Sequence, residues 1–275
     1  MSNLANEDTN TTESVPDVSC LFHPKVVDHP DEFITQLTGI TAPWQEAWGP
    51  VRPWFRGMSK LSFSLEPSLL RYRPRPLVAT ESNLQRQFKQ YAVRLLDKWP
   101  LSRFELLAVM QHHGVPTRLL DWSENAFAAL YFAVKEYQHL DEHEDAVVWI
   151  LEPLRLTEIQ DGQRHIIFTD DRLLEMPNLT LPVYPPHTSE RLSPQRAAFT
   201  LHPFGPQHAL IKIALNEVSA GRPSPLRALR IQANQRRLIR DGMLNVFGSG
   251  EFTFFPDLDG LSRELRMREG LEGRG

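Results

Sequence analysis

Apolar residues recur every three or four positions across residues 81–99. These residues are Leu84, Phe88, Tyr91, Leu95 and Trp99. This spacing places all of them on one face of a helix. Pro100 would end that helix because proline cannot continue it. We therefore predict an amphipathic helix over residues 81–99.

A second helix is predicted to begin at Ser102. Ser102 and Glu105 have the spacing of a capping box, in which two side chains satisfy backbone groups of the first turn. Its inner face would carry Phe104, Leu107 and Met110. Gly114 fits the position just after a helix, where left-handed backbone is common. A shorter helix is expected over residues 31–39, ended by Gly39.

A third helix is predicted from about residue 123 to residue 138, because the run SENAFAALYFAVKEY is apolar over most of a helical circumference. Such a helix should be central in the fold. Its N-cap would be Asp121, with Glu124 completing a capping box, or Ser123.

The pattern then changes to short apolar runs separated by proline and glycine. The strongest strand pattern is DAVVWILEP at 145–153, and VRPWFRGMS at 51–59 predicts a strand that enters a turn at Gly57. Weaker strand patterns occupy 164–170, 197–203, 208–215 and 226–232. Residues 233–242 predict a short helix ended by Gly242, and residues 252–268 predict a strand-like run followed by a helix that starts near Asp257.

These elements indicate an α+β fold, with a helical N-terminal half and a mixed or antiparallel sheet. We expect one domain over residues 25–268. Residues 1–24 should form a disordered tail, since the start of the chain is polar and lacks periodicity. Residues 269–275 should be a flexible C-terminus.

Composition narrows the classes of protein. The 275 residues carry a formal net charge of -4, which does not fit a protein that coats nucleic acid. A single cysteine, Cys20, cannot form an internal disulfide. No apolar run approaches the ~20 residues of a membrane span. We expect a soluble, cytoplasmic protein with no membrane partner.

Two polar stretches carry the candidate chemistry, WFRG at 54–57 and QHHGVPTRLLDW at 111–122. Arg56 at the end of a strand could present a fixed cation to a phosphate, and Gly57 would give a ligand access to the backbone. Thr117 and Arg118 precede the predicted third helix, whose N-terminal amide groups would attract an anion. Together with Arg56 they could hold a diphosphate.

A structural role is the alternative for each of these residues. Arg56 could pair with an internal carboxylate, Arg118 with Asp121, and either His112 or His113 could bond the end of its helix. The two histidines are adjacent and would point about 100° apart on a helix, so they cannot both face one ligand. No His-Glu-x-x-His motif or cysteine cluster is present, and we expect no metal.

The most specific segments resemble the FRG-domain family, which is named for its Phe/Tyr-Arg-Gly motif. They are WFRG at 54–57, SLEPSLLR at 64–71, LLAVMQHHGVPTRLLDWSENAFAALYFA at 106–133 and FFPDLDGL at 254–261. The resemblance covers residues 35–262. It departs from the family at Gln195-Arg196-Ala197-Ala198-Phe199, where the usual pattern is Gln-x-Gly-x-Phe. FRG domains often occur in bacterial toxin and phage-defence contexts, and the resemblance implies such a conflict system here.

The chain is also similar, more distantly, to arginine-type ADP-ribosyltransferases. These enzymes open with a strand that ends in aromatic-Arg-Gly, and their arginine holds the phosphates of NAD. Arg56 and Gly57 match that element, and ALYFA at 129–133 looks like a later one. The glutamate expected near the nicotinamide ribose has only candidate counterparts, which are Glu190, Gln195 and Glu251. The similarity implies an ADP-ribosyltransferase-like fold.

Our leading hypothesis is a binder of a nucleotide diphosphate such as NAD, with ADP-ribosyl transfer or NAD hydrolysis as the reaction. Arg56 and Arg118 would clamp the diphosphate, and His112 would bond the ribose. Asp121 would orient Arg118 or His112, and Gln195 or a nearby acidic residue would support the reacting centre. Gly57, Thr117 and Ser123 would complete the binding site. A protein or a nucleic acid would accept the ADP-ribosyl group.

Two other functions remain open at this point. One is a non-enzymatic regulatory or interaction module, in which the same residues form a satisfied internal network. The other is a nucleic-acid-processing enzyme that works without a metal, in which His112, Arg56 and Arg118 act as acid and base on phosphate.

Overall fold

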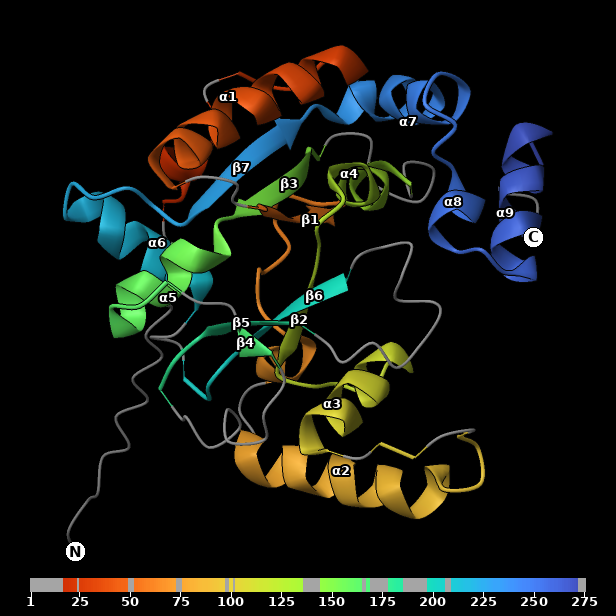
Figure 1. Ribbon diagram of the computed structural model, residues 1–275. Coiled ribbons are helices and arrows are strands. Elements are labelled where there is room, and N and C mark those ends of the chain that lie inside the picture. The colour runs from red at the N-terminus through yellow and green to blue at the C-terminus, as the bar shows by residue number, and fades with distance from the viewer. Residues whose placement is uncertain are drawn as a thin grey trace, which may run out of the picture.

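The structure is a computed structural model that carries no ligand. It describes residues 17–23, 25–48, 52–72, 76–96, 99–100, 102–135, 144–164, 167–168, 178–184, 197–205 and 209–271. The fold is α+β (Figure 1). Among its described helices, none is both long and apolar enough to cross a membrane.

Seven strands form one sheet within the described part of the chain, in the order β4-β5-β6-β2-β1-β3-β7. Neighbours are antiparallel except for the parallel pair β4 and β5. The strands are β1 (Trp54–Met58), β2 (Leu119–Ser123), β3 (Ala146–Leu151), β4 (Ile167–Phe168), β5 (Leu181–Tyr184), β6 (Ala197–Leu201) and β7 (Leu226–Ile231).

The sheet is nearly divided in two between β1 and β2. β1 pairs with β3 over five residues, and β2 pairs with β6 over five residues. Between β1 and β2 the register holds one pair, Phe55 and Ser123. The two halves, β4-β5-β6-β2 and β1-β3-β7, therefore diverge, as the lower and upper groups of strands in Figure 1 show. We call this line of divergence the seam.

Helices cover both faces of the sheet and separate its core into three clusters. One cluster lies between α5 (Pro153–Asp161), α6 (Leu210–Ser219) and the face that carries Trp54, Trp122 and Trp149. On the other face, α1 (Pro30–Trp48), α4 (Ala126–Val134) and α7 (Arg236–Asn245) cover the half built on β1, β3 and β7. Helices α2 (Leu77–Ala92) and α3 (Arg103–His112) lie against the other half.

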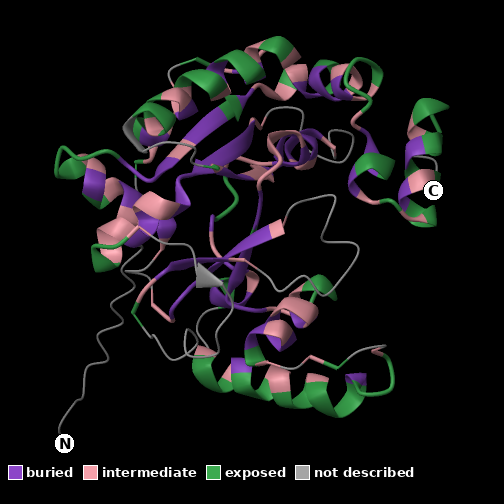
Figure 2. Cartoon of the chain, viewed as in Figure 1, coloured by how far each residue is buried: buried purple, intermediate pink, exposed green. Residues whose placement is uncertain are grey.

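The burial of the strands follows from this covering. Every residue of β3 is buried, because helices pack on both of its faces. Figure 2 shows the upper strands as mostly buried, whereas α2 exposes its outer side. Helices α8 (Glu251–Phe254) and α9 (Leu258–Arg268) lie at one edge of the molecule (Figure 1).

Strand predictions at five of the six segments are confirmed, at β1, β3, β4, β6 and β7. The prediction of a strand over 208–215 is wrong, because α6 begins at Leu210. Its apolar residues Leu210, Ile211 and Ala214 recur at helical spacing and pack on the sheet. The prediction of a strand-like run at 252–256 is also wrong, since α8 occupies most of this segment. The sequence did not indicate β5 or α5.

The capping box of α3 is confirmed, with Ser102 accepting the amide of Glu105. Gly114 has φ +76°, and the amides of Gly114 and Val115 bond the last carbonyls of the helix. The helix predicted over 81–99 instead spans Leu77–Ala92. Its residues Leu84 and Phe88 pack inward, whereas the remaining three of the predicted face, Tyr91, Leu95 and Trp99, are exposed.

Two other glycines, Gly39 and Gly242, do not end their helices as the sequence suggested. Helix α1 continues through Gly39 to Trp48, and α7 continues through Gly242 to Asn245. The prediction near Asp257 is confirmed, because its side chain accepts the amide of Gly260 and caps α9.

Part of the segment expected to be a disordered tail packs on the sheet. Leu21 is fully buried, and the amide of His23 donates to the carbonyl of Ala228 on β7. Residues 19–21 form the short helix η1 (Ser19–Leu21). The ordered fold therefore begins no later than Asp17, whereas residues 1–16 lie outside the described part of the chain.

Candidate functional site

The seam between β1 and β2 is bridged by the side chain of Arg56. Its Nη1 donates a hydrogen bond to the backbone carbonyl of Asp121 at 2.8 Å. In a continuous sheet that carbonyl would accept from a neighbouring backbone amide. Because β1 and β2 diverge beyond Phe55 and Ser123, the guanidinium satisfies this carbonyl instead. Arg56 therefore holds the two halves of the sheet together.

Asp121 is the centre of a short polar network. Its Oδ2 lies 3.7 Å from Nη1 of Arg56 and accepts a hydrogen bond from Nε2 of Gln111 at 2.9 Å. Oε1 of Gln111 in turn accepts from the hydroxyl of Thr117 at 2.5 Å, and that hydroxyl accepts the amide of Leu119 at 3.2 Å. Gln111, Thr117 and Asp121 therefore satisfy one another across the two ends of the 111–122 segment.

Asp121 and Ser123 do not cap a helix, so both capping predictions are wrong. The segment 119–123 is a strand, and the third helix begins later than predicted, at Ala126. Its cap is Asn125, whose Oδ1 accepts the amides of Phe127 and Ala128. The hydroxyl of Ser123 accepts the amide of Asn125 at 2.9 Å. Thr117 and Arg118 consequently precede a strand and face no helix N-terminus.

Arg118 forms a buried ion pair that the sequence did not indicate. Its Nε lies 3.2 Å from Oε1 of Glu81 on α2, and both side chains are more than nine-tenths buried. Its guanidinium also lies 5.1 Å from the ring centre of Phe204. Burial lowers the pKa of Arg118 and raises that of Glu81, and the attraction between them opposes both shifts. Arg118 is thus neutralised by Glu81 and does not pair with Asp121.

Arg56 differs from Arg118 in the distance and exposure of its carboxylate partner. Asp121 is 52% exposed and lies 3.7 Å from Arg56, whereas Glu81 is buried and lies 3.2 Å from Arg118. The Arg56 side chain is itself 25% exposed. Burial lowers the pKa of Arg56, Arg71 lowers it further, and Asp121 opposes the change. A partly buried cation with spare donors is suited to bind an anion.

Behind Arg56 lies a buried set of neutral polar groups. The hydroxyl of Thr200 accepts a hydrogen bond from the indole of Trp122 at 3.0 Å and lies 2.9 Å from Nε2 of His202. The direction of this second hydrogen bond is set by the tautomer of His202, because a hydroxyl can both donate one proton and accept two. Burial, and then the charge of Arg56, lowers the pKa of His202 to about 3. His202 is therefore neutral and adds no charge beside Arg56.

A carboxylate that the sequence analysis treated only as a capping residue lies near the start of β1. Glu124 accepts a hydrogen bond from the hydroxyl of Tyr184 on β5, and its Oε2 lies 3.6 Å from Nη1 of Arg52. The Tyr184 ring packs edge-on against Trp54 at 5.4 Å. Trp54 and Arg56 are two residues apart on β1 and so point to the same face. Glu124 therefore lies near the start of β1, and Arg56 is the third of the five residues of this strand.

No local pattern could have revealed this second cluster. Glu124 and Tyr184 are 60 residues apart in the sequence. Glu124 directly follows β2, Tyr184 ends β5, and β6 lies between these two strands in the sheet. The sequence around Glu124 reads equally well as a helix start. Only the pairing of β5 with β6, and of β6 with β2, brings the phenol to this carboxylate.

The remaining predicted site residues have varied surroundings. His112 is exposed on the last turn of α3, with its ring edge-on to that of His113 at 5.0 Å. Glu251 lies on α8, and its Oε1 is 2.7 Å from Nε of Arg263 on α9. Gln195 and Glu190 lie outside the described residues.

Gly57 serves helix packing in this structure. A Cβ at this position would lie 1.7 Å from the carbonyl oxygen of Ala129 and 2.8 Å from the amide of Ala133. The space that a ligand would need is therefore filled by α4, and we do not include Gly57 in the site. Among the described residues, no group of three or more histidine, cysteine, aspartate or glutamate side chains could hold a metal ion.

Comparison with protein families identifies one region. Residues 52–142 match the FRG domain. The match extends from just before β1 to beyond the end of α4, so it contains Arg56, the 111–122 segment and Glu124. No curated protein and no solved structure matches the chain significantly.

Proposed function

We propose that the FRG domain of this chain binds a nucleotide diphosphate at the seam, with NAD as the substrate. The observation that carries the proposal is the incomplete pairing of Arg56. This guanidinium spans the seam, and its carboxylate partner on Asp121 is half-exposed and 3.7 Å away. A phosphate oxygen would supply a closer anionic partner.

The contacts of Arg56 indicate how a phosphate would be accommodated. The hydrogen bond to the carbonyl of Asp121 uses one N–H of Nη1. An arginine has five N–H donors, so several remain for a ligand. The carboxylate of Asp121 is held on its far side by Gln111, at 2.9 Å, which orients it without bringing it into close contact with the guanidinium. In this proposal Asp121 positions Arg56, and Arg118 belongs to the support of α2.

Cleavage of NAD would require a carboxylate near the ribose, and Glu124 is the described residue that we assign to this role. The bond between C1′ of the ribose and the nicotinamide nitrogen would break, and nicotinamide would leave with the electron pair. The carboxylate of Glu124 would stabilise the positive charge that develops at C1′. Water or an acceptor hydroxyl would then add to C1′ and lose its proton.

The surroundings of Glu124 favour this role. Burial and the hydrogen bond to Glu124 raise the pKa of Tyr184 to about 12. Tyr184 therefore remains protonated at neutral pH and orients the carboxylate by donating to it. His112 and Gln195 keep the roles that their residue types suggest, bonding the ribose and supporting the reacting centre.

The reaction is tested by measuring nicotinamide release from NAD by the full chain and by two variants. Glu124→Gln should lower turnover by about 100-fold or more, because it removes the stabilising charge, while retaining ADP-ribose binding. Arg56→Gln should weaken binding of both nucleotides. Arg230→Gln is the matched control. Arg230 lies on β7, which β3 separates from β1, and its half-exposed side chain pairs with Asp145, just before β3.

Two results would contradict this proposal. The first is release of nicotinamide at the same rate by all three variants, which would place the chemistry elsewhere. The second is binding of ADP-ribose by the wild type without nicotinamide release under any condition. That second result would be consistent with nucleotide binding at the seam and would contradict the proposed cleavage of NAD.

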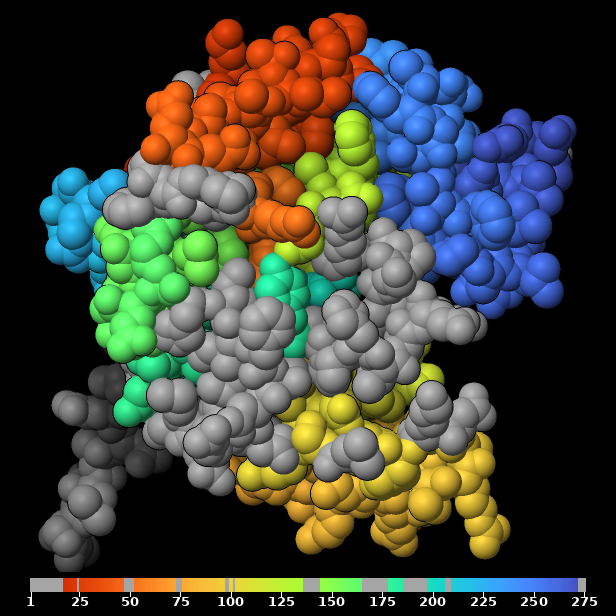
Figure 3. Space-filling model, in the orientation of Figure 1, coloured from red at the N-terminus to blue at the C-terminus, as the bar shows by residue number. Residues whose placement is uncertain are grey.

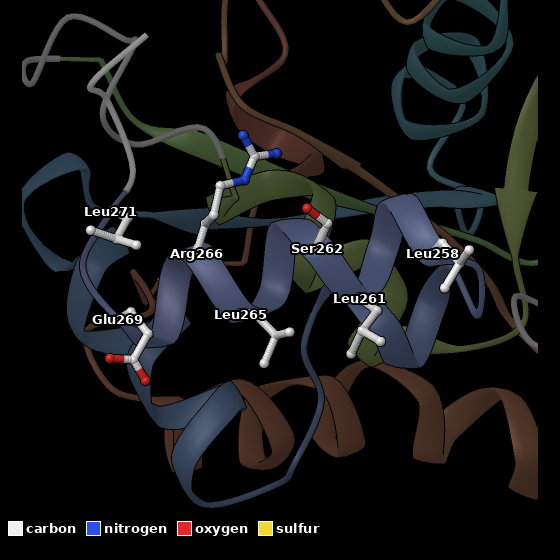
Figure 4. Close-up of a pocket in the computed structure, with 7 residues that line it drawn as sticks. All are labelled: Leu258, Leu261, Ser262, Leu265, Arg266, Glu269 and Leu271. Carbon is white, nitrogen blue, oxygen red and sulfur yellow. The ribbon is translucent and has the colours of Figure 1, made fainter.

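A second candidate function is protein interaction, and the leucines of α9 favour it. Leu258 is 82% exposed and Leu265 is 52% exposed, at helical spacing on one side of this helix. With Leu261, Leu271 and the charged residues Arg266 and Glu269, they line a shallow hollow of about 330 Å³ (Figure 4). Figure 3 shows α9 at the outer edge of the molecule, where a partner could reach it.

Self-association through α9 is the form of this function that can be tested with the chain alone. The solution mass of the wild type should rise with concentration, and the double substitution Leu258→Glu with Leu265→Glu should abolish the rise. Phe63→Glu is a matched control, because Phe63 is exposed and lies outside α9. A wild type that stays monomeric at all concentrations would contradict self-association.

A further inference from the structure

A second pocket lies at the β7 edge of the sheet, away from the seam. One wall is α1, through Gly39, Ile40, Pro43 and Trp44. The segment at Cys20, Phe22 and His23 forms another wall, and the start of α5 and the entry to β7 complete it. Its volume is about 720 Å³, within the range of small-molecule sites in proteins. β3 separates β7 from β1, so this pocket is distinct from the Arg56 site.

Gly39 keeps part of this pocket open. It lies in the middle of α1, where glycine is among the least favourable residues. A Cβ added there would meet no atom within 4 Å, so packing does not require a glycine. Its backbone is helical and needs no left-handed conformation. Because Gly39 has no side chain, the pocket has more space beside Ile40, Pro43 and Trp44.

Pro43 adds a polar group to the same wall. A proline has no N–H, so it cannot donate to the carbonyl of Gly39 one turn earlier. The pocket wall thus contains a backbone acceptor that lacks its usual helical donor. Gly39 and Pro43 both weaken α1 as a helix, and both lie on the side that faces the pocket.

Arg227 gives the pocket a positive charge that no described carboxylate pairs. Its hydrogen bond is to the backbone carbonyl of Cys20, at 3.4 Å. The other charged residues of the pocket are paired more closely. Arg155 lies 2.9 Å from Glu158 and 3.2 Å from Glu217, and Glu152 lies 2.9 Å from Arg164.

Aromatic and apolar side chains line the same pocket as this cation. Phe22 packs its ring against Trp149 at 5.7 Å on the protein side and lines the pocket together with Trp44. Nε of Arg155, which also lines the pocket, is buried without a hydrogen-bond partner. One unpaired cation favours a ligand with a single negative charge, and the ring surfaces favour a flat apolar body.

We propose that this pocket binds a small planar aromatic carboxylate, with its ring between Phe22 and Trp44 and its carboxylate on Arg227. The proposal does not depend on NAD binding at the seam. The space at Gly39 would receive the edge of the ring.

The test is calorimetric titration of the full chain with 2-naphthoate and with its neutral analogue 2-naphthamide. The wild type should bind 2-naphthoate more tightly than 2-naphthamide. Arg227→Gln should weaken binding of 2-naphthoate by about tenfold and leave 2-naphthamide unchanged, because only the carboxylate uses the charge. Gly39→Leu should abolish binding of both probes by filling the pocket.

Gly39→Ala is the matched control, since one methyl group removes little space and improves the helix. It should bind 2-naphthoate as the wild type does. The melting temperature of each variant establishes that it is folded. Failure of the folded wild type to bind 2-naphthoate, or equal binding by Gly39→Leu, would overturn the proposal. Equal affinity of the wild type for both probes would overturn the assignment of Arg227.

Discussion

At the scale of single residues, Gly57 and Gly39 show that the same residue type has opposite structural meanings. Gly57 allows α4 to touch β1, because a Cβ there would lie 1.7 Å from a backbone oxygen. Gly39 faces open space within 4 Å. The sequence marks Gly57 as part of a binding motif and Gly39 as a helix end, and neither role is the one that packing assigns.

Alanine substitution at these two positions should change stability in opposite directions. Gly57→Ala should lower the free energy of unfolding by about 1–3 kcal/mol or more, because α4 must move away from the sheet. Gly39→Ala should raise it by about 0.5–1 kcal/mol, since alanine favours helix. Urea denaturation measures both values. Equal effects of the two substitutions would contradict the close approach of α4 to β1.

His202 should make stability depend on pH. Its folded pKa of about 3 lies below the value of ~6.5 for an unfolded histidine, so the unfolded chain binds the proton more readily. The contribution of His202 is therefore fully present above pH 6.5 and is lost as the pH falls towards 3. The slope from one such proton is about 1.4 kcal/mol per pH unit.

The variant His202→Gln isolates this contribution. Glutamine does not titrate, and its side-chain amide can either donate to the hydroxyl of Thr200 or accept from it. Denaturation of both proteins at several pH values between 6.5 and 4 should show the stability gap narrowing as the pH falls. Parallel pH profiles for the wild type and the variant would show that His202 is not buried in its neutral form.

At the scale of elements, α2 depends on a charged contact more than the sequence suggests. Three of its five predicted inward-facing residues are exposed or lie beyond the helix end, so its apolar contact with the sheet is narrow. Glu81 joins this helix to Arg118, just before β2, through a buried ion pair. Removal of one partner from such a pair leaves a buried charge alone.

Glu81→Gln should therefore destabilise the protein by about 3–5 kcal/mol. The double variant Glu81→Leu with Arg118→Met should recover much of this loss, because neither buried charge remains. Thermal unfolding of the three proteins provides the comparison. A double variant that is less stable than Glu81→Gln would show that Arg118 has a further partner of equal importance.

Element by element, the sequence was most informative where local chemistry determines structure. Ser102 and Glu105 cap α3 by contacts within four residues, and β3 is apolar throughout because both faces are covered. The start of α4 was misplaced because Asp121, Ser123 and Asn125 are all good capping residues. Which of these three residues caps α4 depends on where β2 ends. The pairing of β2 with β6 determines that end, and β6 is about 75 positions away in the sequence.

At the candidate site around Arg56, the sequence likewise indicated features set by local residues and missed contacts between distant elements. The WFRG motif indicated a functional arginine at the end of a strand, followed by a turn at Gly57. Arg56 does lie on β1, but in the middle of it, because the strand continues through Gly57 to Met58. Its partner atom, the carbonyl of Asp121, could not be predicted, because it follows from the divergence of β1 and β2. The partners Glu81 of Arg118 and Tyr184 of Glu124 likewise come from distant elements.

At the scale of the whole molecule, the central feature is the seam between the halves of the sheet. One residue pair and the Arg56 side chain connect β1 with β2, whereas each half is continuous within itself. A ligand bound at Arg56 would contact both halves. Its binding should therefore stabilise the entire fold.

The most direct test is thermal unfolding of the wild type and of Arg56→Gln with NAD, ADP-ribose, ATP and adenosine. At ~100 times its dissociation constant a ligand should stabilise the wild type by about 2.7 kcal/mol. The account predicts this shift with NAD and ADP-ribose, no shift with adenosine, and loss of the shift in a folded Arg56→Gln. No shift with any nucleotide, together with early melting of Arg56→Gln, would make Arg56 a purely structural link and contradict the binding site.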